Sequence, residues 1–376
     1  MNIGINASFL RKPGTGIGQV TFSFLEKLKE LPTSDEFFIY TEEEYPEIGY
    51  PKHFHFRNFL PFWKRDDLIR KWLWERQVAR EAKKDGCDVF LSLYQTTTIF
   101  PAAFHHVMVV HDIIPRLFPE YRGNMRQKWY WQVVERGIRQ ANHIITISEA
   151  TKKDLLGFGI VPERITVAYP DTASIFKRIP SKEEEQRVLE KYSLKPGYIY
   201  HGGGLEIRKN TAGLLHAYKQ LVDHNQTVPP LVISGKIFSE QNPLATPVRK
   251  MVRELGLEKQ VQLLDFVPET DLPTLYKNAL FFIYPSFYEG FGLPVLEAIC
   301  MGTPVLVSDT SSLREVAGEA ALYIDPHSID SIASGMSRVI ADASLLEPLR
   351  RATQGGQERF SWQRFVEAVI HSLKER

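Results

Sequence analysis

Short apolar runs alternate along this chain with longer stretches of helical periodicity, and this alternation constrains the fold more than any other feature. The runs are rich in β-branched and aromatic residues, as strands that are covered on both faces are. A strand-then-helix rhythm predicts a mostly parallel sheet with helices on both faces. In the first half we expect strands at Ile3–Ala7, Phe37–Tyr40, Phe54–Asn58, Val89–Ser92, His106–Val110, His143–Ile147 and Ile165–Ala168. The helices between them are expected at Gly18–Leu31, Lys71–Lys84, Arg126–Gln140 and Glu149–Gly157.

The rhythm stops over residues 170–180 and restarts after a charged helix. This break predicts an α/β protein with two doubly wound, Rossmann-like domains that face each other across a cleft, the first over 1–175 and the second over 176–358. The last segment, 359–376, has a helix with one apolar face, which we expect to pack back on the N-terminal domain. Strands of the second domain are expected at Tyr198–Gly202, Leu231–Ser234, Val261–Phe266, Leu280–Tyr284, Pro304–Ser308 and Ala321–Ile324.

Length and charge narrow the class of protein. A chain of 376 residues suits two domains better than one core. The 46 basic and 45 acidic side chains nearly cancel, so nucleic acid is not an expected partner. Two cysteines, Cys87 and Cys300, lie in apolar surroundings and are expected to be buried thiols. The first residues do not resemble a signal peptide and no apolar run is long enough to span a bilayer, so the cytoplasm is the expected compartment.

The strongest local motif is the run Tyr284–Ala298. A buried strand leads directly into a loop with Gly290 and Gly292, and Pro294 then opens a helix. The free N–H groups of a first helical turn attract anions, and glycines let the backbone approach a ligand closely. The run therefore indicates a phosphate-binding turn.

Two carboxylates lie in the same run, Glu289 in the loop and Glu297 in the helix. A carboxylate accepts hydrogen bonds from vicinal hydroxyls, which suits a sugar or a ribose. A single Glu here would more simply cap the helix, but the whole run favours ligand binding.

A second motif, His201–Asn210, follows the first strand of the second domain. Its glycines, Gly203 among them, leave room for a ligand, and the adjacent cations Arg208 and Lys209 supply charge for a diphosphate. Taken alone, such a pair of cations is most often just solvated.

Two weaker motifs lie in the first domain. The glycine loop with Gly16, Ile17 and Gly18 follows the first strand, but Gln19 stands where a dinucleotide fingerprint needs glycine. His111 and Asp112 end an apolar strand at the expected cleft edge. A lone histidine at such a place is more often structural than catalytic.

With seven residues between Glu289 and Glu297, the run resembles the signature of the family 4 retaining glycosyltransferases, which have the GT-B fold. The resemblance extends over nearly the whole chain. It implies that Glu289 contacts hydroxyls of the donor sugar and Glu297 binds the donor ribose. Backbone amides of Phe291, Gly292 and Leu293 are then expected to meet the diphosphate.

The same resemblance gives roles to the other motifs. Arg208 and Lys209 would stabilise the departing phosphate, although Gly204 stands where the family commonly has an arginine. The glycine loop would close over the diphosphate and the acceptor. His111 would lie beside the transferred sugar with Asp112 next to it. The form His-Asp-x-x-Pro resembles bacterial mannosyl- and rhamnosyltransferases of surface polysaccharide assembly, such as lipopolysaccharide.

These resemblances imply a retaining hexosyltransferase whose acceptor binds on the N-terminal side. Arg208, Lys209 and the helix start would stabilise the leaving group electrostatically, and the chain has no Asp-x-Asp motif, so no metal and no cofactor are expected. A GDP-sugar, first of all GDP-mannose, is the favoured donor, with UDP- and dTDP-sugars left open. The acceptor is a hydroxyl of a glycan or of a lipid-linked glycan. A nucleotide-sugar epimerase and a binding subunit without turnover stay as alternatives.

An aromatic and basic stretch over residues 59–74 raises a further hypothesis. Such side chains suit peripheral contact with an anionic membrane, which would place the protein at the inner face of the cell membrane. A core helix with Trp72 turned inward and charges turned outward explains the pattern equally well.

Overall fold

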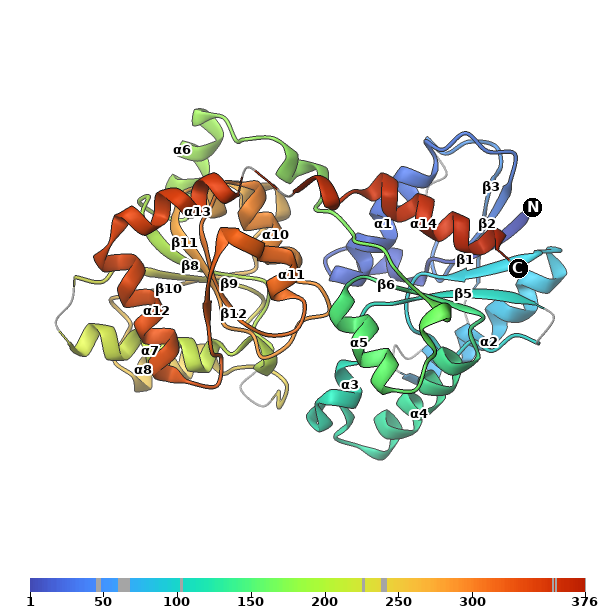
Figure 1. Cartoon of the computed structure of the whole chain (residues 1–376), viewed down its shortest axis with the longest axis horizontal. Coiled ribbons are helices and arrows are strands. Elements are labelled where there is room, and N and C mark those ends of the chain that lie inside the picture. The colour runs from blue at the N-terminus through green and yellow to red at the C-terminus, as the bar shows by residue number, and fades with distance from the viewer. Residues whose placement is uncertain are drawn as a thin grey trace. The chain divides into compact units, whose positions relative to one another are not determined.

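The computed structural model describes residues 1–44, 49–59, 68–101, 104–224, 227–237, 242–353, 355 and 357–375. The chain divides into two compact units. The first unit comprises residues 1–171 and 360–376, and the second unit comprises residues 172–359. Each unit is an α/β structure built on its own parallel sheet (Figure 1).

The first unit contains a parallel sheet in the order β3-β2-β1-β4-β5-β6-β7 within the described part of the chain. Its central strands are buried along almost their whole length, which explains their continuously apolar sequences. The strands are β1 (Asn2–Asn6), β2 (Glu36–Thr41), β3 (Phe54–Asn58), β4 (Val89–Ser92), β5 (His105–Val110), β6 (His143–Thr146) and β7 (Ile165–Val167).

Helices cover both faces of this sheet. The last helix of the chain belongs to this unit: the rings of Phe365 and Phe24 meet edge to face at 6.2 Å, and Lys374 pairs with Asp35 at 2.9 Å. The helices are α1 (Gly16–Leu28), α2 (Leu68–Lys84), α3 (Ile114–Leu117), α4 (Met125–Gln140), α5 (Glu149–Gly157) and α14 (Trp362–Lys374), with 3-10 turns η1 (Ser8–Arg11), η2 (Pro119–Arg122) and η3 (Pro162–Arg164).

The second unit contains a parallel sheet in the order β10-β9-β8-β11-β12-β13 in the residues that the structure describes. Its register slips by one residue in β10 and in β11. The strands are β8 (Tyr198–His201), β9 (Leu231–Ser234), β10 (Val261–Asp265), β11 (Ala279–Tyr284), β12 (Val305–Ser308) and β13 (Ala321–Ile324).

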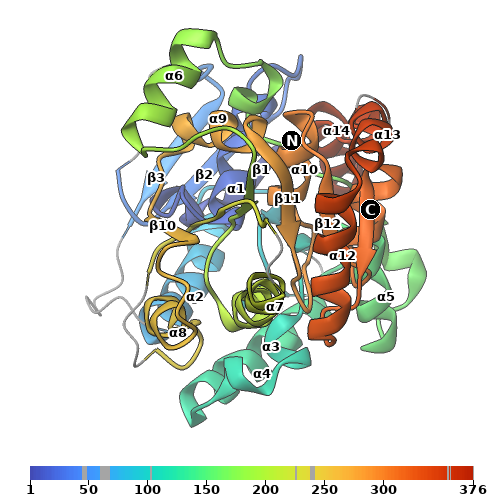
Figure 2. The ribbon, with the colours of Figure 1, turned by 90° about the vertical axis from the view of Figure 1, so that its left-hand side faces the viewer.

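Figure 2 shows α7 and α8 on one side of this sheet and α6 and α9 on the other. The helices are α6 (Lys182–Lys191), α7 (Thr211–Asp223), α8 (Val248–Glu254), α9 (Leu272–Lys277), α10 (Leu293–Cys300), α11 (Leu313–Ala317), α12 (Ile329–Ala341) and α13 (Leu346–Ala352). Short 3-10 turns join them: η4 (Ser174–Lys177), η5 (Ile207–Lys209), η6 (Glu269–Asp271), η7 (Gly318–Ala320), η8 (Ala343–Leu345) and η9 (Gln357–Arg359).

The strand order confirms the expected doubly wound α/β class for both units. In each sheet the order reverses between two central neighbours, β1 and β4 in the first unit and β8 and β11 in the second. Loops that leave such neighbours diverge to opposite faces and open a crevice at the carboxyl ends of the strands, where ligands of these sheets bind. We call these two places the reversal points.

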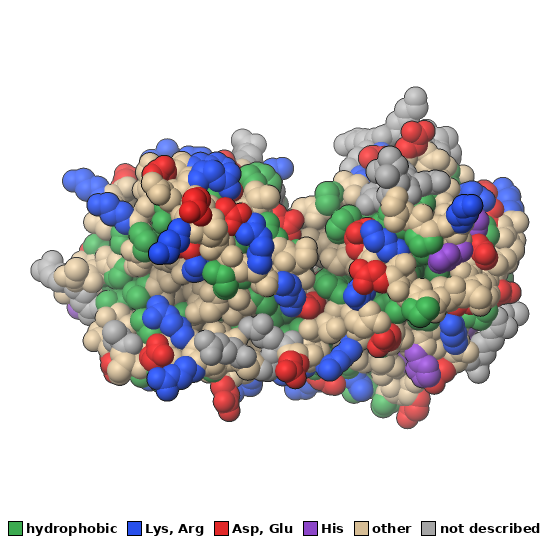
Figure 3. All heavy atoms as spheres, turned by 90° about the horizontal axis from the view of Figure 1, so that it is seen from above, with side chains coloured by type: hydrophobic (Ala, Val, Ile, Leu, Met, Phe, Trp, Pro, Cys, Tyr) green, Lys and Arg blue, Asp and Glu red, His purple; other side chains and the backbone are tan. Residues whose placement is uncertain are grey.

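The expected strands and helices are all present, with small shifts at their ends. The first helix begins at Gly16 rather than Gly18, because the Thr15 side chain caps it by accepting a hydrogen bond from the Gly18 amide. Among the described residues, every helix falls short of the length or the apolarity needed to cross a bilayer. On the face seen in Figure 3, basic and acidic side chains are interspersed over each unit.

Candidate active site

The reversal point of the second unit brings Arg208, Lys209 and Glu289 into direct contact. Lys209 Nζ lies 2.8 Å from Glu289 Oε1, and an Arg208 guanidinium nitrogen lies 2.7 Å from Glu289 Oε2. Lys209 also donates to the hydroxyl of Tyr284, and Arg208 pairs with Glu206 at 2.9 Å. Lys209 and Glu289 are only 6% and 5% exposed, so this is a buried charge cluster.

Local backbone contacts hold this cluster in place. Arg208 and Lys209 lie in η5 after β8, and Glu289 lies in the loop after β11. The two segments are tied together because the Phe287 amide donates to the Arg208 carbonyl at 2.8 Å. The Ser286 hydroxyl donates to Glu289 Oε1 at 2.7 Å, which orients the carboxylate toward the two cations.

The charges of the cluster are strongly coupled. Burial alone would raise the pKa of Glu289, but the Arg208 and Lys209 charges lower it to about 2. Burial and the neighbouring guanidinium lower the pKa of Lys209. Glu289 therefore remains a carboxylate at every working pH, with both cations held around it.

The glycine turn after Glu289 leads directly into α10. Gly292 has a φ of 108°, which only glycine adopts readily, and a Cβ there would lie 2.8 Å from a Leu313 methyl group. Gly203 in the other loop has no room either, since a Cβ would lie 2.7 Å from Pro294 Cγ. The two loops thus pack closely where Leu293 and Pro294 start the helix, and the amides of its first turn form an anion-attracting end.

Phe291 is buried in this turn, and its carbonyl accepts a hydrogen bond from Ser312 at 2.6 Å. Glu297, one turn into α10, joins a different group: its Oε2 accepts from the Tyr276 hydroxyl at 2.8 Å. Burial raises the pKa of Glu297 to about 7. Glu289 is therefore always charged, whereas Glu297 is near its titration point at neutral pH.

In the first unit, the glycine loop is a tight turn at the start of α1. A Cβ on Gly18 would collide with the Lys12 carbonyl, whereas Gly16 faces open space. The Ile17 carbonyl accepts from the Thr21 hydroxyl at 2.8 Å within the helix. The loop therefore requires glycine at 18 for packing and leaves Gly16 free to approach a ligand.

His111 follows β5 and is buried. Its Nε2 donates to the Leu93 carbonyl at 2.8 Å, and its own carbonyl accepts from the Thr151 hydroxyl at 3.2 Å. Burial lowers the pKa of His111 to about 4, so the ring is neutral at pH 7. Asp112 accepts from the Ile114 amide at 2.9 Å and so stabilises the start of α3.

Sequence reasoning did not single out several residues at these places. Tyr284 and Ser286 contact the charge cluster directly, and both lie inside the motif run, where they could have been noticed. Ser311, whose hydroxyl accepts from the Glu289 amide at 2.9 Å, arrives from a distant loop with no motif of its own.

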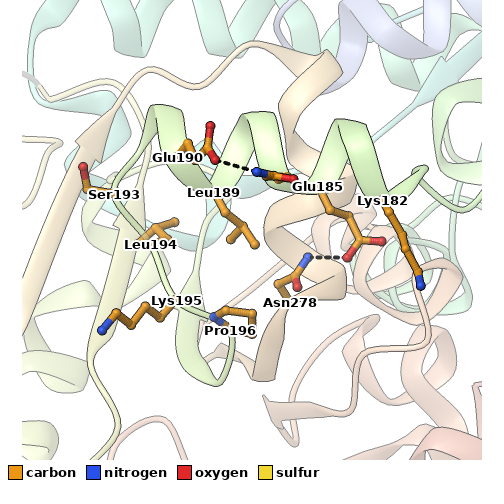
Figure 4. A pocket seen from close by; sticks show the side chains of 10 residues that line it. Lys182, Glu185, Leu189, Glu190, Ser193, Leu194, Lys195, Pro196 and Asn278 are labelled. Atoms are coloured by element: carbon orange, nitrogen blue, oxygen red, sulfur yellow. Dashed lines mark hydrogen bonds between the residues drawn. The ribbon is translucent and has the colours of Figure 1, made fainter.

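A groove of the second unit lies away from these residues (Figure 4). This groove of about 680 Å³ is lined by α6 and the segment that leads into β8, and by Asn278 just before β11. It therefore lies at the amino ends of the strands, opposite the edge that carries the motifs. None of the residues predicted to bind the donor lines it.

Comparison with known proteins agrees with this reading of the fold. The family described as Glycosyltransferase Family 4 matches residues 14–170, and Glycosyl transferases group 1 matches residues 181–359. The chain is 34% identical to O-antigen chain mannosyltransferase B of Escherichia coli over 271 residues, 71% of this chain and 70% of that protein. It is 25% identical to O-antigen chain mannosyltransferase RfbU of Salmonella typhimurium over 343 residues, 89% of this chain and 90% of that protein.

The fold is also similar to that of WaaG, a glycosyltransferase involved in lipopolysaccharide biosynthesis, with a TM-score of 0.74 and 14% identity over the whole of both chains. Two doubly wound parallel sheets, with the charge cluster at one reversal point, define the class: a glycosyltransferase with the GT-B fold. Within that class, the chain belongs to glycosyltransferase family 4.

Proposed function

We propose that this glycosyltransferase transfers a hexose, first of all mannose, from a GDP-sugar to a hydroxyl of a glycan or lipid-linked acceptor, with retention of the anomeric configuration. The names of two relatives, both O-antigen chain mannosyltransferases, support mannose and a role in surface polysaccharide assembly. The buried cluster of Arg208, Lys209 and Glu289 at a reversal point is the observation that carries the proposal.

The cluster suits a leaving diphosphate. When the bond between sugar and nucleotide breaks, negative charge develops on the phosphate, and two fixed cations beside a helix start stabilise it. In the free protein, Glu289 pairs with both cations, and Glu206 also pairs with Arg208. A bound donor would supply phosphate oxygens to Arg208 and Lys209, and its sugar hydroxyls would donate to Glu289. Glu297, and the amides of Phe291, Gly292 and Leu293, would hold the ribose and the diphosphate.

We propose that no metal or cofactor takes part, because Arg208 and Lys209 supply the charge that a divalent cation would supply. We also propose that the acceptor attacks from the side that the leaving group vacates, with a phosphate oxygen taking the acceptor proton. The ring of His111 is neutral and directs its Nε2 proton to Leu93, and the backbone carbonyl of His111 would lie beside the transferred sugar. Asp112 and the glycine loop with Gly16, Ile17 and Gly18 would complete the donor site.

The deciding experiment is nucleotide release from GDP-, UDP- and dTDP-sugars by the purified protein, with EDTA and with Mg²⁺. We expect release from GDP-mannose, unaffected by EDTA and lost in Glu289→Ala. Release from a UDP- or dTDP-sugar instead would correct the donor. Loss of release in EDTA would refute metal independence, and conversion of the donor sugar without nucleotide release would indicate an epimerase.

Retention needs a separate measurement. NMR of the product from an α-linked donor should show an α-linked sugar as the first product formed. A β-linked product would refute the retaining mechanism. Nucleotide-sugar binding without any release or product would favour a binding subunit.

We further propose that the protein works at the inner face of the cell membrane. Of the aromatic and basic stretch, residues 60–67 lie outside the described residues, Trp74 is fully buried, and Arg70 pairs with Glu42 at 2.9 Å. The described residues with a better surface for lipid lie on α4 and the preceding turn, where Met125 is 79% exposed and Trp129 43% exposed.

Trp129 packs against Trp72 at 5.4 Å, and Arg126 and Lys128 are exposed beside it. Exposed apolar side chains flanked by cations suit an anionic bilayer surface. At low salt the protein should sediment with vesicles that contain phosphatidylglycerol, and Met125→Ser with Trp129→Ser should weaken this. Phe266→Ser, which removes a 71% exposed ring next to Asp265, is the control. Equal sedimentation of both variants would refute the surface.

A further inference from the structure

The reversal point of the first unit carries a cluster of polar side chains that lies outside all the sequence motifs described above. Asn6 ends β1, Ser8 follows it, and Tyr94 follows β4. Asn6 Nδ2 lies 3.2 Å from the Tyr94 hydroxyl and Ser8 Oγ lies 3.1 Å from it. The side chains of the two diverging loops therefore meet at the place where a doubly wound sheet binds a ligand.

Glu75 of α2 is the centre of this cluster and is fully buried. Its Oε1 accepts from the Tyr94 hydroxyl at 3.0 Å and from the Tyr130 hydroxyl at 3.2 Å. Its Oε2 accepts from the amide of Thr97 at 3.0 Å and from the Thr97 hydroxyl at 2.5 Å. The hydrogen-bonding capacity of the carboxylate is thus taken up by groups of the protein, and it fixes α2, α4 and the loop after β4 together.

Lys71 lies one helical turn before Glu75, and its ammonium is held by rings. Its Nζ lies 4.6 Å from the ring centre of Tyr94, 5.2 Å from that of Phe9 and 5.4 Å from that of Tyr130. The nearest Glu75 oxygen is 3.9 Å away, which is too far for a hydrogen bond. In the described part of the chain, no group accepts a hydrogen bond from this ammonium, although only 24% of the side chain is exposed.

This ammonium can therefore donate hydrogen bonds to a ligand. Three-quarters of the Lys71 side chain is covered, and cation–π contacts replace only part of the hydration of a free ammonium. Burial accordingly lowers the pKa of Lys71. A ligand with oxygen acceptors would restore the missing hydrogen bonds, and the ring of Phe9, which is partly exposed, offers an apolar surface beside them.

Charges of both signs surround Lys71: Glu75 and Glu42 attract its ammonium, whereas Lys12 and Arg11 repel it. Glu75 balances Lys71, and the next carboxylate, Glu42, pairs with both Arg11 at 3.1 Å and Arg70 at 2.9 Å. The ring of Phe9 beside the ammonium favours a sugar over a bare phosphate, because a sugar offers hydroxyls to the ammonium and an apolar face to the ring.

We propose that Lys71 and Phe9 bind the sugar unit of the acceptor: the ammonium donates to its hydroxyls and the aromatic ring packs on its apolar face. This inference rests on the proposed transferase function, because the second unit supplies the cations for the donor diphosphate and the first unit then receives the other substrate. Glu75 and Tyr94 are positioning residues that hold the ammonium at the reversal point.

Lys71→Met tests this directly, since it keeps the length and the apolar stem and removes only the charge. Transfer is measured as nucleotide release from GDP-mannose with and without lipid-linked glycans extracted from the source organism. We expect the acceptor KM to rise about tenfold or more, as loss of a charged hydrogen-bond donor does, while release without acceptor stays within about twofold of wild type. Phe9→Leu should raise the acceptor KM by a smaller factor.

Lys219→Met is the matched control, because Lys219 also lies one turn from an acid, Asp223, on an exposed helix face. Lys219→Met should change neither the acceptor KM nor the nucleotide release without acceptor. An unchanged acceptor KM in Lys71→Met, with normal release and normal thermal stability, would overturn the inference and leave the transferase function intact. Absence of release by the wild-type protein from every donor would instead overturn the function on which it rests.

The same assay distinguishes a sugar from an anion. Competitive inhibition of the wild-type protein by inorganic phosphate, removed by Lys71→Met, would show that the ammonium binds an anionic group and would overturn the assignment to sugar hydroxyls. No competition by phosphate, with competition by simple mannosides, is the expected result.

Discussion

The two reversal points share their geometry and differ in their chemistry. Both lie between neighbouring strands whose loops diverge, and both hold a buried glutamate, Glu289 in the second unit and Glu75 in the first. Glu289 is surrounded by two cations, which a ligand can take over. Glu75 is surrounded by hydroxyls and an amide that belong to the fold. Glu289 can thus exchange its partners for groups of a substrate, whereas Glu75 holds parts of the fold together.

This difference predicts that both losses lower stability and that only the loss of Glu289 abolishes nucleotide release. Glu289→Gln should reduce nucleotide release by roughly 100-fold or more, because the donor loses the carboxylate for its hydroxyls and the cations lose their orientation. It should also destabilise the second unit by roughly 3–5 kcal/mol, because Lys209 remains buried without a counter-charge and Arg208 keeps only Glu206. Glu206→Gln, which removes a more exposed partner of Arg208, is the control for both measurements.

A double variant sharpens this prediction. Adding Lys209→Met to Glu289→Gln removes one of the uncompensated charges, so the double variant should be more stable to urea than the single variant. It should remain inactive. A double variant no more stable than Glu289→Gln would mean that the charges do not interact as the distances indicate.

Glu75→Leu should lower stability without abolishing nucleotide release. It leaves two tyrosine hydroxyls and the Thr97 groups without their acceptor and Lys71 without its nearest counter-charge, and we expect a loss of about 3–5 kcal/mol in the free energy of unfolding. Nucleotide release in the absence of acceptor should persist below the lowered melting temperature. If release fell as far as it does in Glu289→Gln while the protein remained folded, the division between an exchangeable and a rigid cluster would be wrong.

The smallest predicted effect is a dependence on pH that comes from Glu297. Its carboxyl has an ordinary pKa of 4.5, and burial raises it to about 7 in the folded protein. Between these values the folded state binds more protons than the unfolded state, so stability should fall as pH rises from about 4.5 to 7, by about 3 kcal/mol at most. Glu297→Gln should remove this fall, as thermal melts across that range would reveal.

Binding gives a second readout of the same group. If Glu297 accepts from the donor ribose as a carboxylate, calorimetry should show the affinity for GDP increasing from pH 6 to pH 8 in the wild-type protein and not in Glu297→Gln. A flat profile in both proteins would remove Glu297 from the nucleotide site.

The fold could be predicted from the sequence, and the residues of the second cluster could be singled out, because both depend on contiguous segments. Buried parallel strands need continuously apolar runs, and Arg208, Lys209, Glu289 and Glu297 come from two short segments of the chain. The cluster of the first unit is assembled from β1, α2, the loop after β4 and α4. No local pattern carries it, because each segment contributes one or two side chains.

The helix α2 shows the same limit at a single place. Trp74 and Glu75 are adjacent in the chain and both fully buried, on a helix with a strongly charged sequence. The hydrophobic periodicity of α2 does not predict that a carboxylate faces inward beside a tryptophan. The groups that donate hydrogen bonds to this carboxylate come from segments distant in the sequence. The state of Glu297 was equally hidden, because only the packing around Tyr276 determines how far its pKa rises.

The assignment of α14 to the first unit has a consequence for how the protein is made. Phe365, Val366, Val369 and Leu373 are fully buried there, yet the ribosome translates them only after the whole of 172–359. At ordinary translation rates that interval lasts about 10 to 40 s. During it, the nascent first unit exposes the apolar surface around Phe24 that α14 later covers. Folding of the first unit can therefore be completed only after α14 is made, and the nascent unit without α14 has an apolar surface that chaperones can bind.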